Sequence, residues 1–306
     1  MKLPGINMSD MFGRMEENVY DNYGANKQRD EKYELTNKAG QLWTVFLSQM
    51  KLFTKSYLPI LMIVFVALIP VLIYSGVLDS AIINPIREEI GDTGETYVAI
   101  CLGLLPVMMA LISCMICGSM LPSEFRYRTA YLNFPLPQSR MTFYLGKFLA
   151  GYALVLATIL SAFAVSILMA TFAGYDSVSS AAIGEAMLLS IAGSFAFCSI
   201  AYGLSAFMSH GSTMFPFVLI FIMIPAFTLI MADAGGFGDL VGYVPSFAGD
   251  LALASLGSDQ TLSVSLLLTN IDVQMTASVP LAATASLICG VLFLLIGMSK
   301  TRSREI

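Results

Sequence analysis

Residues 97–123 read YVAICLGLLPVMMALISCMICGSMLPS and contain no charged side chain. A helix needs about 20 apolar residues to cross the hydrocarbon of a bilayer, so this stretch predicts a membrane-spanning helix. Its apolar residues run continuously, without the alternation of a barrel strand, and backbone groups in lipid must satisfy one another. Five other stretches share these properties: 57–78, 148–175, 186–209, 214–232 and 273–299. The sequence therefore predicts an all-α membrane protein with six transmembrane helices over 57–299.

The charged residues lie between these stretches and predict the orientation of the chain. Short loops rich in Lys and Arg stay on the cytoplasmic side of a membrane. With both termini inside, Arg87 is the only one of the 16 basic residues that falls outside. The outer segments are acidic, including the long one at 233–272. We expect a cytoplasmic N-terminus and a cytoplasmic tail at 300–306.

Two segments precede the first span. Residues 1–40 mix acidic and basic side chains and lack the apolar core of a signal peptide, so they predict a partly flexible cytoplasmic head. Residues 41–56 show a helical period, with an apolar face that Gln49 interrupts. We expect an interfacial amphipathic helix on the inner membrane surface; the alternative is an inward extension of the first span. The residues expected to anchor this helix are Trp43, Phe46, Met50 and Phe53.

The longest inner loop, 124–147, joins the second and third spans. Ser123 can cap a short helix that starts at Glu124, and prolines further along the loop end that helix. The short helix would display aromatic residues beside Arg126 and Arg128, a composition that protein interfaces favour. We interpret the loop as a docking surface for a soluble partner. The alternative is that the two arginines only follow the inside-positive rule.

At this loop the sequence resembles the permease subunits of type-2 ABC exporters. Those permeases have a cytoplasmic head, an interfacial connecting helix, six spans with both ends inside, a coupling helix between spans two and three, and short helices in the last outer segment. The chain departs from the family's loop pattern at Arg128, where glycine is common, and at Tyr131, where one of two paired leucines is common. The resemblance implies that a separate ATPase couples to the chain through Glu124, Phe125, Arg126, Arg128, Thr129, Leu132, Pro137, Ser139, Arg140 and Lys147.

The resemblance also implies an assembly. The family works as two permeases around a central path with two ATPase subunits beneath, so we expect an ABC ATPase and a second permease copy, identical or related, as partners within the lipid bilayer. ATP and Mg would bind to the ATPase, since this chain has no G-x-x-x-x-G-K-[ST] motif. We expect the chain itself to bind no cofactor, metal or nucleic acid and to catalyse no reaction. The family's distribution implies the plasma membrane of a bacterium or archaeon.

The spans limit what can move through them. Ion-coupled carriers usually place charged residues within the membrane, and none of the six stretches contains one. A conduit lined by Phe, Met and Tyr side chains suits an amphipathic or lipid-like cargo, exported with energy from the partner. The candidate lining residues are Tyr74, Tyr152 and Tyr202.

Two other classes of function stay open. A self-sufficient secondary transporter or channel would need no ATPase, although such proteins often show an internal repeat, and no convincing repeat is present here. A non-transporting membrane anchor protein would act through the head, 1–40.

Small residues within the spans allow close helix packing. Gly146 with Gly151, and Gly193 with Ala196, are candidates for contacts between two permease copies. The five cysteines also lie within spans, and Cys114 and Cys117 form a C-x-x-C pair. With no His or acidic residue nearby, packing is the favoured interpretation of these cysteines.

Overall fold

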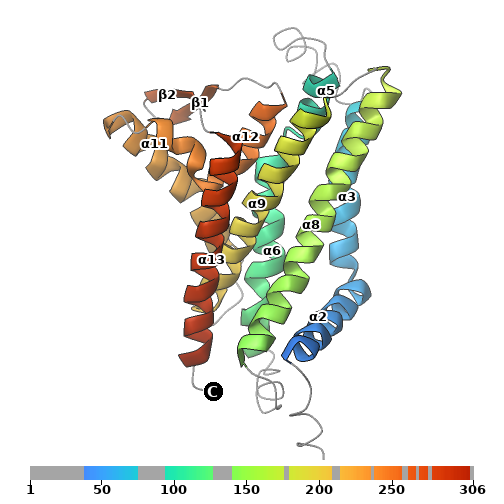
Figure 1. Cartoon of the computed structure of the whole chain (residues 1–306), viewed down its shortest axis with the longest axis vertical. Coiled ribbons are helices and arrows are strands. Elements are labelled where there is room, and N and C mark those ends of the chain that lie inside the picture. Colours follow the sequence, from blue (N-terminus) through green and yellow to red (C-terminus); the bar gives the residue numbers. More distant parts are fainter. Residues whose placement is uncertain are drawn as a thin grey trace, which may run out of the picture.

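Figure 1 shows the computed structural model of the chain, a bundle of long helices with shorter elements gathered at one end. The structure describes residues 38–74, 94–126, 140–175, 179–208, 214–235, 238–256, 261–266, 269–274 and 278–303. The predicted head, 1–40, therefore lies outside the described residues except for 38–40.

Four stretches of helix are long and apolar enough to cross a membrane: Tyr97–Glu124, Met141–Phe172, Ser180–Ser205 and Val279–Ser303. They agree with the predicted second, third, fourth and sixth spans. The helices that contain them are α5 (Gly94–Cys101) followed by α6 (Leu105–Arg126), then α8 (Arg140–Phe172), α9 (Ser180–Ser205) and α13 (Val279–Ser303). Helix α9 lies at the centre of the bundle and packs against both α6 and α13, so most of its residues are buried.

The predicted first span has a different form. Helix α3 (Tyr57–Tyr74) follows α2 (Lys38–Lys55), and the two bend by 67° where they meet. Taken together, the two helices are long and apolar enough to form one bent span. Helix α2 is therefore a separate helix and not a straight extension of α3. The last residues of the predicted span, 75–78, lie outside the described residues.

The predicted fifth span is a helical run of three parts. These are α10 (Met214–Val218), a π-helical turn η2 (Leu219–Met223) and α11 (Ile224–Gly235). A proline donates no backbone hydrogen bond, so Pro216 and Pro225 favour a change of helix type between them. The apolar stretch Phe215–Ile230 is shorter than the four long spans. The described structure thus supports four spans, or five when the bent pair counts as one, against the six predicted.

Both ends of the described chain lie at the same end of the bundle (Figure 1). Helix α2, the end of α6, the start of α8 and the last turn of α13 meet there. Following the predicted topology, we call this the inner end and the opposite end the outer end.

The outer end carries the shorter elements. Two 3₁₀ turns, η3 (Gly238–Tyr243) and η4 (Pro245–Phe247), lead into α12 (Ala248–Ser255), in agreement with the short helices that the resemblance implies. A hairpin of β1 (Thr261–Leu266) and β2 (Thr269–Gln274) follows, in which Thr261 pairs with Gln274. The hairpin qualifies the all-α prediction, which holds for the long spans.

Small residues bring neighbouring helices together within one chain. A Cβ atom on Gly146 would lie 2.9 Å from Val45 of α2, and one on Gly151 would lie 2.8 Å from the sulfur of Met120 in α6. Gly193 meets Ala248 of α12 in the same way, and Ala196 is fully buried. The prediction that these positions pack between two copies is wrong, because helices of the same chain already fill them.

Candidate coupling site

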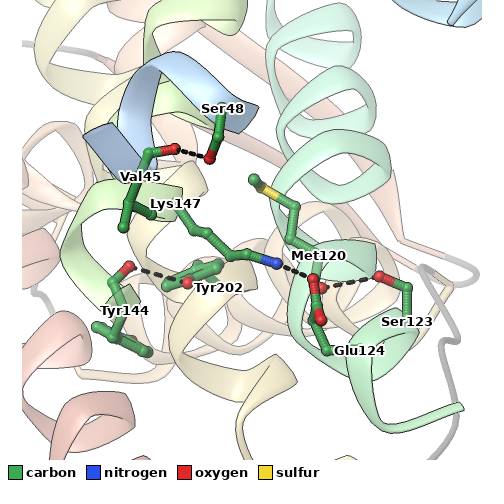
Figure 2. A network of polar contacts seen from close by, with 8 residues as sticks. All are labelled: Val45, Ser48, Met120, Ser123, Glu124, Tyr144, Lys147 and Tyr202. Carbon is green, nitrogen blue, oxygen red and sulfur yellow. Dashed lines mark hydrogen bonds and ion pairs between the residues drawn. The ribbon is translucent and has the colours of Figure 1, made fainter. Parts of the chain in front are cut away.

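An ion pair joins the two helices that carry the predicted coupling loop. Glu124 lies in the last turn of α6 and Lys147 about two turns after the start of α8, and their side chains meet in Figure 2. The side chain of Glu124 is only 16% exposed, and that of Lys147 only 6%. Charges removed from water need a partner, since an unpaired buried charge costs several kcal/mol, roughly 3–5. The pair therefore fixes α6 and α8 to each other on either side of the loop.

The surroundings of Lys147 are otherwise apolar. Its ammonium group lies 4.7 Å from the centre of the Phe143 ring, a distance suited to a cation–π contact. Among the described residues, Lys147 is the most completely buried charged residue. Such a position is stable because Glu124 supplies the opposite charge.

A second contact ties the start of α8 to α9. The buried hydroxyl of Tyr202 donates a hydrogen bond of 2.9 Å to the backbone carbonyl of Tyr144. The two rings pack with their centroids 4.6 Å apart, and Phe148 adds a third ring 5.6 Å from Tyr202. The start of α8 is thus held on one side by α6 and on another by α9.

Helix α2 covers the same part of α8. Val45 packs against Gly146, one residue before Lys147, and Gln49 is buried one turn further along α2. The face of α2 predicted to be apolar therefore lies against the protein. Trp43, Leu47 and Leu52 of the same helix are exposed.

A cavity of about 410 Å³ lies beside the ion pair, between α2, α3, α6 and α8. Glu124 and Lys147 form one part of its wall, and Gln49 and Lys55 of α2 form another. Most of the remaining wall is apolar, with Met62 of α3 as one contributor. The inner end thus combines a rigid helix junction with an open space next to it.

The structure brings together some of the predicted coupling residues. Glu124 and Lys147 contact each other, Phe125 and Arg126 are the last residues of α6, and Arg140 is the first of α8. The other predicted coupling residues lie outside the described residues: Arg128, Thr129, Leu132, Pro137 and Ser139.

The residues predicted to anchor the interfacial helix occupy two environments. The exposed ring of Trp43 stacks on Phe46, with centroids 5.1 Å apart. Phe46, Met50 and Phe53 are half-buried, and Phe53 lines the cavity. Trp43 is thus the anchoring residue with the most exposed surface.

The three tyrosines predicted to line a path are not brought together. Tyr202 and Tyr152 belong to the packed aromatic interior between α8 and α9, where the Tyr152 hydroxyl donates a hydrogen bond of 3.1 Å to the carbonyl of Ile191. Tyr74 is exposed at the end of α3. In a single chain, therefore, these residues do not share one described cavity.

The cysteines show no sign of a site. Cys114, Cys117 and Cys198 are fully buried as free thiols. Among the described residues, no group of three His, Cys, Asp or Glu side chains could hold a metal ion.

The expectation that Ser123 caps a new helix starting at Glu124 is wrong, because α6 continues through both residues to Arg126. The Ser123 hydroxyl instead donates to the Met120 carbonyl of the same helix.

Sequence reasoning also missed two features of this site. Gln49 was treated as a defect in an apolar face, although an amide in that position is a signal of a polar contact or a polar cavity wall. The role of Tyr144 depends on its backbone carbonyl, which no side-chain pattern reports.

The sequence model of the family described as ABC-2 family transporter protein matches residues 11–245, which is most of the chain. The matched region includes α2, the Glu124–Lys147 pair and the whole loop between α6 and α8. No curated protein matches the sequence.

Proposed function

We propose that this chain is the membrane-spanning permease subunit of an ATP-driven exporter. The chain belongs to the ABC-2 transporter family, as a multi-pass permease that is not itself catalytic. In this proposal a separate ABC ATPase docks on the loop 124–147 and hydrolyses ATP with Mg. Two permease copies, identical or related, form the path in the plasma membrane of a bacterium or archaeon. The alternatives are a self-sufficient transporter and a non-transporting anchor protein.

The Glu124–Lys147 pair is the observation that carries the proposal. A loop held only by its chain ends could move without moving the spans. Here the helices on both sides of the loop are joined at its base, so a force on the loop reaches α6 and α8 together. The contacts of Tyr202 and Val45 with the start of α8 would pass the motion to α9 and α2.

The chemistry of the spans supports an amphipathic or lipid-like cargo. Among the described residues, Lys147 is the one charged residue that is almost completely buried; it lies at the inner end and pairs with Glu124. The interior between α8 and α9 is instead aromatic. Such surroundings give a small ion no group to replace its hydration, whereas they suit apolar chains.

Copurification from native cells tests the proposal. The tagged chain is isolated in a mild detergent, its partners are identified by mass spectrometry, and ATPase activity is measured. The variant Arg126→Ala/Arg128→Ala removes two loop charges and leaves Glu124 with its partner. We expect the ATPase to copurify with the wild type and to fall about tenfold or more in this variant, as for loss of interface arginines.

The matched control removes two charges at the same end but away from the loop, as Lys300→Gln/Arg302→Gln in the last turn of α13. It should retain the ATPase. Equal recovery with both double variants would contradict docking on the loop, and a chain that copurifies without any ATPase would favour the self-sufficient transporter.

A further inference from the structure

The wall of the cavity at the inner end has an unbalanced charge. It contains three charged side chains, Lys55, Glu124 and Lys147. Glu124 and Lys147 neutralise each other. Among the described residues Lys55 has no carboxylate partner, and it lies on the exposed side of the cavity wall. The cavity therefore presents one positive charge to whatever enters it.

Gln49 gives the cavity an unused set of hydrogen-bonding groups. Its side chain is 9% exposed, lines the cavity, and has no hydrogen-bond partner among the described residues. The amide atoms reach the open space of the cavity, since Gln49 is not among the residues whose polar atoms are fully buried without a partner. A polar ligand that enters the cavity can therefore form hydrogen bonds with this amide. Ser119 lines the cavity too, but its hydroxyl already donates to carbonyls of its own helix.

The rest of the wall is apolar and leads to a lipid-facing surface. Leu52, Phe53 and Met62 contribute to it. Leu52 is exposed as well as cavity-lining, and the adjacent part of α3 exposes Ile60 and Leu61. In a membrane protein such a surface contacts acyl chains. The cavity thus joins a cationic, hydrogen-bonding part to an apolar part, which is the pattern of an amphiphile with an anionic head.

We propose that this cavity binds one anionic phospholipid of the inner leaflet. Its phosphate would contact Lys55 and Gln49, and its acyl chains would lie along Met62 and the exposed face of α3. A volume of about 410 Å³ is within the range of small-ligand sites, roughly 300–1,000 Å³, and suits a headgroup while the chains extend outside. The bound lipid would brace the 67° bend between α2 and α3 next to the Glu124–Lys147 pair.

Two matched pairs of variants test the proposal. Lys55→Gln removes the charge in the wall, and Lys51→Gln removes an exposed charge one turn earlier on α2 that does not line the cavity. Ser119→Leu fills the cavity without breaking a contact between helices. Ser48→Leu is its control, because the exposed Ser48 also bonds only to its own helix. Each purified chain is titrated with phosphatidylglycerol or phosphatidylcholine in detergent, and bound lipids are counted by native mass spectrometry.

We expect Lys55→Gln to weaken phosphatidylglycerol binding about fivefold, as for loss of one lysine near an anionic headgroup. Phosphatidylcholine binding should weaken less, because the choline cation offsets the charge of the phosphate. Ser119→Leu should weaken binding of both lipids, and both controls should bind like the wild type. An equal loss in Lys51→Gln and Lys55→Gln would overturn the proposal, because attraction by the whole helix surface would then explain it.

Unchanged binding in Ser119→Leu would also overturn the proposal, since the lipid would then lie elsewhere. The lysine pair concerns exposed side chains, so that comparison remains decisive if Ser119→Leu fails to fold. The result is independent of the ATPase, because lipid binding is measured on the purified chain alone.

Discussion

Glu124 at the inner end and Asp250 at the outer end are both largely buried carboxylates, but their surroundings differ. Glu124 meets the ammonium group of Lys147. Asp250 lies in the first turn of α12 and has no cationic partner among the described residues. Burial raises the pKa of the Asp250 carboxyl from its ordinary 3.8 to about 6. One end of the bundle compensates a buried negative charge, and the other favours its protonation.

The contacts around the two acids differ in the same way. The inner end is held by the ion pair and by the hydrogen bond from Tyr202 to Tyr144. At the outer end α12 is held mainly by close approach, since a Cβ on Gly193 would lie 2.6 Å from the Cβ of Ala248. The inner end is thus stabilised by paired charges and the outer end by close packing. Removing a charge should destabilise the inner end, and disturbing the packing should destabilise the outer end.

The largest effect is expected from Lys147→Met. The change keeps an apolar stem of similar length but takes the Lys147 ammonium group away from the largely buried Glu124. Removing one member of a buried ion pair costs about 3 kcal/mol or more, so we expect a loss of that size in the free energy of unfolding. Thermal or denaturant unfolding in detergent measures it.

The double variant Glu124→Gln/Lys147→Met provides the control. It removes both charges, and replacing a buried ion pair by uncharged groups is often nearly neutral. We expect it to regain more than half of the lost stability. A double variant as unstable as Lys147→Met would show that packing of the lysine stem, and not charge compensation, holds the inner end.

Gly193→Ala tests the shape match at the outer end. The added methyl group would clash with Ala248 and displace α12, at a cost of about 2 kcal/mol. Gly184→Ala is the matched control on the same helix, because a Cβ there would have no atom within 4 Å, and alanine should stabilise the helix by about 0.5–1 kcal/mol. The free energy of unfolding should therefore fall in Gly193→Ala and rise in Gly184→Ala. Equal changes in the two variants would exclude a specific contact between α9 and α12.

The spans could be predicted from sequence because a charge in lipid is costly wherever it lies, so charge-free stretches mark membrane helices independently of their partners. The same reasoning identified Glu124 and Lys147 as bounds of the loop. It did not predict that they pair, since they are 23 residues apart and the contact depends on how α6 and α8 pack.

The contacts at the outer end could not be predicted from local sequence patterns. Asp250 reads in the sequence as one more acid of an outer segment, and its burial follows from the contact of α12 with α9 and α6. The fit of Gly249 against Pro106, where a Cβ would lie 2.8 Å from the proline Cα, joins residues distant in the sequence. Periodicity and composition report on one element at a time, so neither could predict these contacts.

Asp250→Asn tests the contrast between the two acids most directly, through its pH dependence. Because the folded chain raises the pKa of this carboxyl from 3.8 to about 6, the folded state binds more protons than the unfolded state between these values. The contribution of Asp250 is therefore most favourable below pH 3.8 and is lost as the pH rises through about 6. The asparagine variant carries no charge, so at pH 8 it should be more stable than the wild type by about 1 kcal/mol, the shift being limited by partial exposure of the side chain.

Unfolding of wild type and variant is compared from pH 5 to pH 8, with Glu185→Gln, an exposed acid on α9, as the control for loss of one negative charge. The advantage of Asp250→Asn should shrink as the pH falls, because the wild-type carboxyl then takes up a proton and loses its desolvation penalty. Glu185→Gln should track the wild type throughout. A constant advantage of Asp250→Asn would show that the pKa of this carboxyl is not raised into this pH range. A loss of stability at pH 8 would show that Asp250 is ionised and compensated by a cation, so that the two ends of the bundle hold their acids in the same way.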